Sequence, residues 1–158
     1  MLNYDSLIDF AITETQGDLL KSNVLTRLAA EMGEGLYHLT NGESGTLPNC
    51  LRDVSIKYQY ANPESLPTTG PDNKIINEPH SFSRILSNAF YEIIIKIAEK
   101  HNEMPLKDAI KCARDIMAKY LITASKSVPL CVRFFDAFCR QLLYVDKAHG
   151  GKYQSVLN

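Results

Sequence analysis

Histidine and cysteine side chains are the first candidates for chemistry in this chain of 158 residues. Two histidines four residues apart on one helix could bind zinc, but no pair has that spacing among the four present, which are His38, His80, His101 and His149. A CxxC pair is also missing from the four cysteines, Cys50, Cys112, Cys131 and Cys139. Their apolar neighbours favour small buried thiols, with disulfides as the alternative, and we expect a reduced, cytoplasmic protein.

His80 stands out by its position. It follows a segment rich in turn-forming residues and precedes a strongly apolar helical pattern, so we place it in the first turn of a helix. The positive end of the helix dipole disfavours a protonated imidazole there. A neutral imidazole that donates one hydrogen bond would suit the stabilisation of an oxyanion, and the alternative is a surface histidine at a helix start.

The elements that must position these residues are mostly helical. Apolar side chains at three- and four-residue spacing predict helices at Asp5–Thr15, from Asp18 to about Met32, at Ser81–Lys100, and after Met104-Pro105 and Val128-Pro129. Dense Gly, Pro, Asn, Ser and Thr residues predict a long ordered loop segment from about 33 to 77, and a frayed tail follows from about 150 to 158. We therefore predict an all-α fold, with residues 1–158 forming a single helical domain, a multi-helix bundle with one long loop segment.

Composition and missing motifs limit the possible functions. The formal net charge of −1 gives no electrostatic basis for binding nucleic acid or an anionic membrane. The longest apolar run, from Phe90 to Ala98, is interrupted by two charged residues, and the N-terminus has no signal-peptide pattern. The HExxH, GxSxG, GxGxxG and GxxxxGK[ST] motifs are missing, which removes the common self-contained catalytic signals. We expect neither nucleic acid nor a membrane as a partner.

Two stretches carry a pattern that points to a known family. The run HSFSRILSNAFY, from His80 to Tyr91, places a histidine and a small polar residue before an apolar helix, and the run CLRDVS, from Cys50 to Ser55, precedes it. These stretches resemble segments of the thermolysin-like zinc metallopeptidases, the gluzincins. The resemblance implies that His80 helps to hold the tetrahedral intermediate and that Arg52, 28 residues earlier, binds a substrate carbonyl. On the residues alone, Arg52 could instead pair with Asp53 or Glu64.

A third stretch concerns the metal. Asp5 and Asp9 have the spacing of the family's glutamate zinc ligand and of the aspartate that orients a zinc-bound histidine, and Gly33-Glu34 resembles a pair that follows this helix. The resemblance implies the orienting role for Asp9. Asp5 is one methylene shorter than the expected glutamate, so it is either a weak ligand or the cap of the first helix.

The family's HExxH helix, which lies upstream in those enzymes, is missing from this chain. The resemblance therefore implies a C-terminal helical lobe that is inactive alone and holds no cofactor alone, with Zn expected in a complete enzyme. Its expected partners are an N-terminal zinc-binding half and a peptide or protein substrate. Two alternatives remain: a non-catalytic helical interaction or regulatory protein derived from that lobe, and an unrelated all-α domain.

Overall fold

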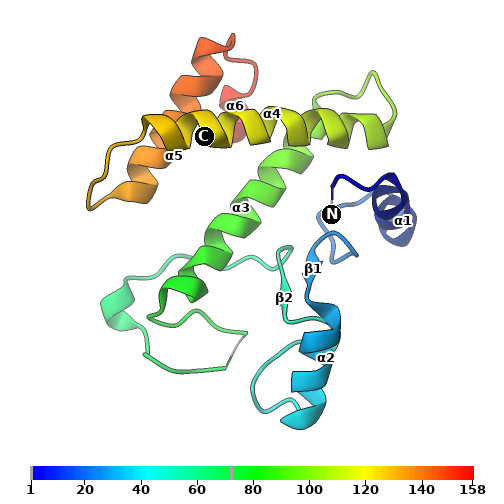
Figure 1. Ribbon diagram of the computed structural model, residues 1–158, viewed down its shortest axis with the longest axis vertical. Helices are drawn as coiled ribbons and strands as arrows, with labels where there is room; N and C mark the ends of the chain where they lie inside the picture. The colour runs from blue at the N-terminus through cyan, green and yellow to red at the C-terminus, as the bar shows by residue number, and fades with distance from the viewer. Residues whose placement is uncertain (1, 72) are drawn as a thin grey trace. The chain divides into compact units, whose positions relative to one another are not determined.

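The computed structural model describes residues 2–71 and 73–158, and it is mostly helical, which confirms the predicted all-α character. Its contacts divide the chain into two compact units, one ending at Glu92 and the other formed by Ile93–Asn158. The central helix α3, Pro79–Glu99, begins in the first unit and ends in the second (Figure 1). The single domain expected from the sequence stays a prediction.

The first unit joins short elements to the start of α3. In chain order it contains the helix α1 (Asp5–Thr15), the strand β1 (Arg27–Leu28), the helix α2 (Ala30–Leu39), the strand β2 (Arg52–Asp53) and the 3-10 turn η1 (Pro63–Ser65). The strands pair antiparallel, with Leu28 opposite Arg52. α2 lies inside the segment expected to be loop, and from residue 40 to residue 78 the described chain has only β2 and η1 as regular elements.

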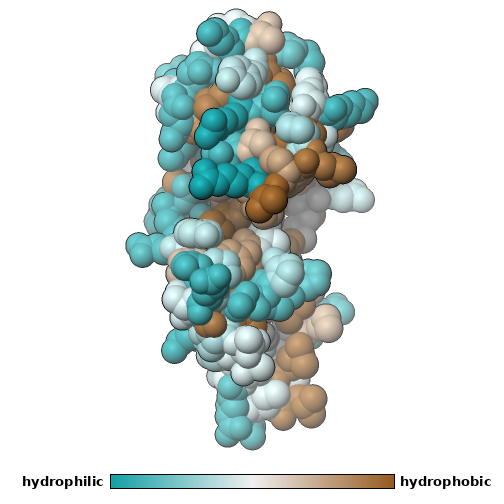
Figure 2. Space-filling model, turned by 90° about the vertical axis from the view of Figure 1, so that its left-hand side faces the viewer, coloured by the Kyte–Doolittle hydropathy of each residue, from teal (hydrophilic) through white to brown (hydrophobic). Residues whose placement is uncertain are grey.

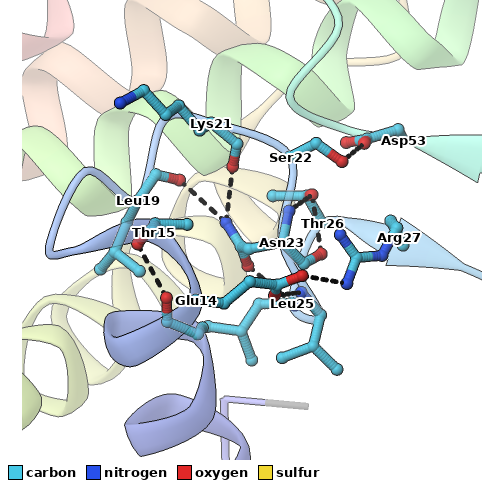
Figure 3. A network of polar contacts seen from close by, with 12 residues as sticks. Glu14, Thr15, Leu19, Lys21, Ser22, Asn23, Leu25, Thr26, Arg27 and Asp53 are labelled. Carbon is cyan, nitrogen blue, oxygen red and sulfur yellow. Dashed lines mark hydrogen bonds and ion pairs between the residues drawn. The ribbon is translucent and has the colours of Figure 1, made fainter.

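The helix predicted from Asp18 to about Met32 is wrong: turns and β1 occupy this stretch, and α2 begins only at Ala30. The physical reason is the buried side chain of Asn23, which donates hydrogen bonds to the backbone carbonyls of Leu19 (3.2 Å) and Lys21 (2.7 Å), as Figure 3 shows. Such bonds offer the backbone an alternative to helical hydrogen bonding. The apolar spacing that predicted the helix carries no information about this competition.

The strand β2 is fixed by hydrogen bonds to its Asp53 carboxylate. The Ser22 hydroxyl donates to one carboxylate oxygen, and the Ser55 backbone N–H (2.8 Å) and hydroxyl (2.7 Å) donate to the other (Figure 3 shows the Ser22 contact). Burial works to raise the pKa of Asp53, but these hydrogen bonds outweigh it and hold the pKa below its ordinary value. Asp53 is thus a charged, fully engaged anchor beside Arg52.

A close backbone contact holds the chain just before β2. Gly33 of α2 lies against the peptide that joins Cys50 and Leu51, where an added Cβ would be 1.9 Å from the Cys50 carbonyl carbon. Only a residue without a side chain fits this approach. The helix α3 contributes as well, because the Asn88 amide donates to the Val54 carbonyl at 2.7 Å.

The second unit packs the helix α5 (Phe134–Ala148) against α4 (Leu106–Ser127) and the short α6 (Gln154–Leu157). α4 begins next to Pro105 as predicted, whereas α5 begins later than the predicted start after Val128-Pro129. Residues 128–133 form no helix in the structure. The core of this unit is apolar and includes Ile97, Ile110, Ala113, Phe138 and Leu142.

The C-terminal tail packs against this unit, contrary to the frayed end expected from about 150. Asp146, fully buried, accepts hydrogen bonds from the Tyr120 hydroxyl (2.9 Å), the Tyr153 backbone N–H (3.2 Å) and the Gln154 amide (2.8 Å). The Tyr153 hydroxyl also lies 2.7 Å from Nε2 of His101, which is buried. This polar network was invisible to a prediction based on the two glycines alone.

The cysteines are all free thiols, but their burial differs from the expectation. Cys50 is buried and Cys112 is partly buried, whereas Cys131, which precedes α5, and Cys139, which lies on α5, are exposed. Burial raises the pKa of Cys50, which is the ordinary state of an inert structural thiol.

Among the described residues, no helix is both long enough and apolar enough to cross a lipid bilayer.

Candidate ligand-binding cleft around Arg52

A polar cleft of about 430 Å³, counting the solvent at its mouth, lies in the first unit. Its lining comes from the strand β2, from the loop that precedes α3 and from the first turns of α3, and comprises Leu51, Arg52, Gly70, Pro71, Lys74, Ile76, Glu78, Ser81 and Arg84. Three of these residues are cations and one is an acid. The described lining therefore favours a ligand that presents oxygen acceptors.

Arg52 and Arg84 both line this cleft and two smaller hollows beside it, and Arg52 is the one with the exposed side chain. Its side chain is exposed, and within residues 2–71 and 73–158 its guanidinium has no hydrogen bond or ion pair. The ion pair with Asp53 or Glu64 that the sequence left open is not formed, since Asp53 is engaged by Ser22 and Ser55. The five N–H donors of this guanidinium are thus not engaged by any residue that the structure describes.

Glu78 lines the cleft together with Arg52 and lies close to His80. Its carboxylate accepts a hydrogen bond from the Ser81 backbone N–H (2.8 Å) and lies 3.9 Å from Nε2 of His80. Lost hydration works to raise the pKa of Glu78, but hydrogen bonds from the His80 and Ser81 backbone and the charges of His80 and Arg52 together lower it. Both residues predicted to act on substrate therefore lie close enough to influence the same carboxylate.

His80 lies in the first turn of α3, as the sequence predicted, and its side chain is 81% exposed. His80 does not line the cleft. Its Nε2 atom lies 3.9 Å from the carboxylate of Glu78, which does line the cleft. An imidazole this open can turn toward a ligand that enters from solvent.

Arg84 braces the wall of the cleft. Its guanidinium lies 4.7 Å from the centre of the Tyr58 ring and donates to the Tyr58 hydroxyl (3.3 Å), the Ser81 hydroxyl (2.8 Å) and the Lys74 carbonyl. These contacts tie the loop before α3 to the helix. Arg84 therefore acts on the shape of the cleft, whereas Arg52 keeps its donors open.

The structure does not bring the two predicted aspartates to this cleft. Asp5 and Asp9 lie on α1, and Figure 1 shows α1 apart from the N-terminal end of α3. The Asp9 backbone carbonyl accepts a hydrogen bond from Thr13 within the same helix. No group of three or more His, Cys, Asp or Glu side chains that could hold a metal ion occurs in the part of the chain that the structure describes. The described residues therefore do not fit a zinc ion.

Glu78, Tyr58 and Arg84 were not identified from the sequence as site residues. Glu78 had a local signal, because an acceptor three residues before Ser81 at a helix start is a capping pattern. Tyr58 lies in the loop segment, for which the sequence favours a solvated role over the lining of a cleft, and Arg84 had no signal, because the two meet only when the long loop folds back onto α3.

The chain was compared with protein-family models, with curated proteins and with solved structures, and none of the three comparisons found a match.

Proposed function

We propose that this chain is the substrate-binding helical lobe of a gluzincin-type zinc metallopeptidase and is inactive as a peptidase alone. The observation that carries the proposal is that Arg52 and Glu78 line one cleft, with His80 3.9 Å from the Glu78 carboxylate, and that the Arg52 guanidinium has no hydrogen bond within the described residues. The two residues are those to which the family resemblance assigns substrate contacts. The link of both residues to Glu78 was not implied by the 28 residues that separate them in sequence.

Arg52, His80 and Glu78 each have a separate role in the proposed function. Arg52 donates hydrogen bonds to a backbone carbonyl of an extended peptide. His80 donates one hydrogen bond to the oxygen that becomes an oxyanion as the scissile carbonyl is attacked. Glu78 lines the cleft with Arg52, and its carboxylate, 3.9 Å from Nε2 of His80, provides a hydrogen-bond acceptor near the imidazole.

The proposed function does not place the zinc ion in this chain. Because the described residues contain no zinc ligand set, the proposal takes zinc and the attacking water from a separate N-terminal half, in which the metal would polarise the carbonyl and activate water. Asp9 would orient a zinc-bound histidine of that half, and Asp5 would be at most a weak ligand.

A second candidate function is a non-catalytic interaction protein built on the same lobe. The observation that favours it is a group of apolar side chains left exposed in the second unit, between α4 and α5. The two functions differ in where a partner binds, so they can be separated by experiment.

Peptide binding tests the proposal. The probe is a blocked dipeptide, N-acetyl-phenylalanyl-leucyl amide, which offers backbone carbonyls and no charge, and binding is followed by nuclear magnetic resonance. We expect Arg52→Gln to weaken binding by about tenfold or more, because a hydrogen bond from a charged donor contributes about 1.5–3 kcal/mol.

The matched control is Arg133→Gln, which removes an exposed arginine of the second unit and should leave the affinity unchanged. Equal affinity in the wild-type chain and in Arg52→Gln, or no binding by the wild-type chain, would contradict the proposal.

A further inference from the structure

The connection between α4 and α5 leaves apolar side chains standing in solvent. Leu130 is 98% exposed and Val132 is 105% exposed, so neither is covered by the unit that carries it. On the flanking helices, the last turns of α4 and the first turn of α5 add further exposed apolar residues, namely Leu121, Ile122, Phe134 and Phe135. We call these six residues the hairpin tip. Apolar side chains left exposed along one segment are a candidate interaction surface.

The charges around the hairpin tip have one dominant sign. From Lys119 to Arg140 the sequence contains four basic residues and a single acid, Asp136, whereas the whole chain has a net charge of −1. Arg140 is held by Asp136 at 2.9 Å, while Lys126 and Arg133 are exposed on either side of Leu130. The expectation of no membrane partner used the whole-chain charge, which hides this local excess.

The shape of the tip also restricts the partner. Leu130 and Val132 are almost fully exposed, so they do not line a groove that could enclose a small ligand. They can instead insert into the surface of a larger partner. On the face drawn in Figure 2, apolar side chains lie next to strongly hydrophilic ones. Apolar side chains with adjacent cations are the composition that binds the boundary between lipid headgroups and acyl chains.

We propose that the hairpin tip binds the surface of a membrane that contains anionic lipids. Leu130, Val132 and Phe135 enter the headgroup region, and Lys126 and Arg133 pair with lipid phosphates and carboxylates. The association is peripheral, since no helix in the described residues could cross a bilayer. It goes beyond the proposed peptide-binding function, because it uses other residues and another unit of the chain.

A single introduced tryptophan gives the most direct test, because the natural chain contains none. Phe135→Trp places the reporter in the hairpin tip, and Phe10→Trp places it at a residue of the first unit with the same exposure, 57%. The probes are vesicles of phosphatidylcholine alone and of phosphatidylcholine mixed with phosphatidylserine. We expect the mixed vesicles to shift the emission of Phe135→Trp to the blue and to leave that of Phe10→Trp unchanged.

Two double variants identify the chemistry. Leu130→Ser with Val132→Ser removes the apolar contacts at positions too exposed to support the fold, and Lys126→Glu with Arg133→Glu reverses the charges. Both should lose co-sedimentation with the mixed vesicles, and Leu39→Ser, which changes an 80% exposed leucine of α2, should keep it.

Three results would overturn the proposal. Equal binding to neutral vesicles would remove the role of the cations, and a blue shift of Phe10→Trp equal to that of Phe135→Trp would remove the role of the tip. Self-association of the wild-type chain in sedimentation, lost in the Leu130→Ser, Val132→Ser variant and without vesicle binding, would identify the tip as a protein interface.

Discussion

Glu78 is the residue that connects the two site residues named from the sequence. It caps the first turn of α3 through Ser81 and shares electrostatic contacts with His80 and Arg52. The motif pattern located Arg52 and His80, because each lies in a short run of characteristic residues. It could not locate Glu78, whose importance arises from the fold that brings β2 beside the start of α3.

The Glu78 carboxylate should stabilise the first turn of α3 only while it is ionised. Its pKa is lowered in the folded chain, so its contribution is complete above the ordinary carboxyl pKa, about 4.3, and is lost as the pH falls through the lower folded-state pKa. We predict that Glu78→Gln speeds amide hydrogen exchange at Ser81 and Phe82 at neutral pH. The control Glu34→Gln, at an exposed position of α2, should not change these rates. Unchanged exchange in Glu78→Gln would show that the cap carries no stability.

Elements with a single apolar stripe were predicted well, and the exceptions have identifiable causes. α1, α3 and α4 follow their stripes closely. The expected helix after Asp18 failed because Asn23 binds nearby backbone carbonyls, and α5 starts late although the stripe extends to Cys131. Periodicity reports which face of a helix can be buried, and it does not report side chains that compete for backbone hydrogen bonds.

The contact between α2 and the chain before β2 predicts opposite effects for two glycines of one helix. Gly33→Ala should destabilise the first unit by about 3 kcal/mol or more, because its Cβ would overlap the backbone of Cys50 and Leu51. Gly35→Ala meets nothing within 4 Å and should stabilise the helix by about 0.5–1 kcal/mol. Urea unfolding of both variants checks the pair. A similar effect of the two substitutions would refute the close approach that positions Arg52.

The polar network that holds the C-terminal tail predicts a loss of stability in alkali. Burial raises the pKa of Tyr120, and its hydrogen bond to Asp146 and the charge of that carboxylate raise it further. The stabilisation is therefore complete below the ordinary tyrosine pKa, about 10, and is lost as the pH rises through the folded-state pKa.

We predict that Tyr120→Phe lowers the free energy of unfolding by about 1.5–3 kcal/mol at neutral pH, because one hydrogen bond to the buried Asp146 carboxylate is lost. The variant should also lose less stability than the wild-type chain above pH 10. Tyr144→Phe changes a tyrosine that is 62% exposed and serves as the control. Thermal unfolding followed at several alkaline pH values makes the comparison, and parallel pH profiles for all three chains would argue against the network.

For the molecule as a whole, the all-α character was predictable because it depends only on periodicity and on the lack of alternating strands. The two compact units were not, because one continuous amphipathic pattern runs through α3 and gives no sign of a division at Glu92. The local charge excess at the hairpin tip was equally hidden in a net charge near zero.

Zinc binding and peptidase activity can be tested on the whole chain. Because the described residues contain no ligand set, we predict that the chain with added zinc does not hydrolyse casein and binds zinc no more tightly than isolated histidines do. Calorimetry at neutral pH and a peptide-release assay measure the two properties. Micromolar zinc affinity accompanied by hydrolysis would refute the claim that the chain is inactive alone.

The central claim is that Arg52 and His80 serve one ligand. Its most direct test is a resonance titration with N-acetyl-phenylalanyl-leucyl amide that follows the Arg52 Nε–H and the His80 ring signals in the same samples. We predict that both signals move with one dissociation constant, while the ring signals of the buried His101 stay fixed. Movement of one site residue without the other, or of neither, would contradict it.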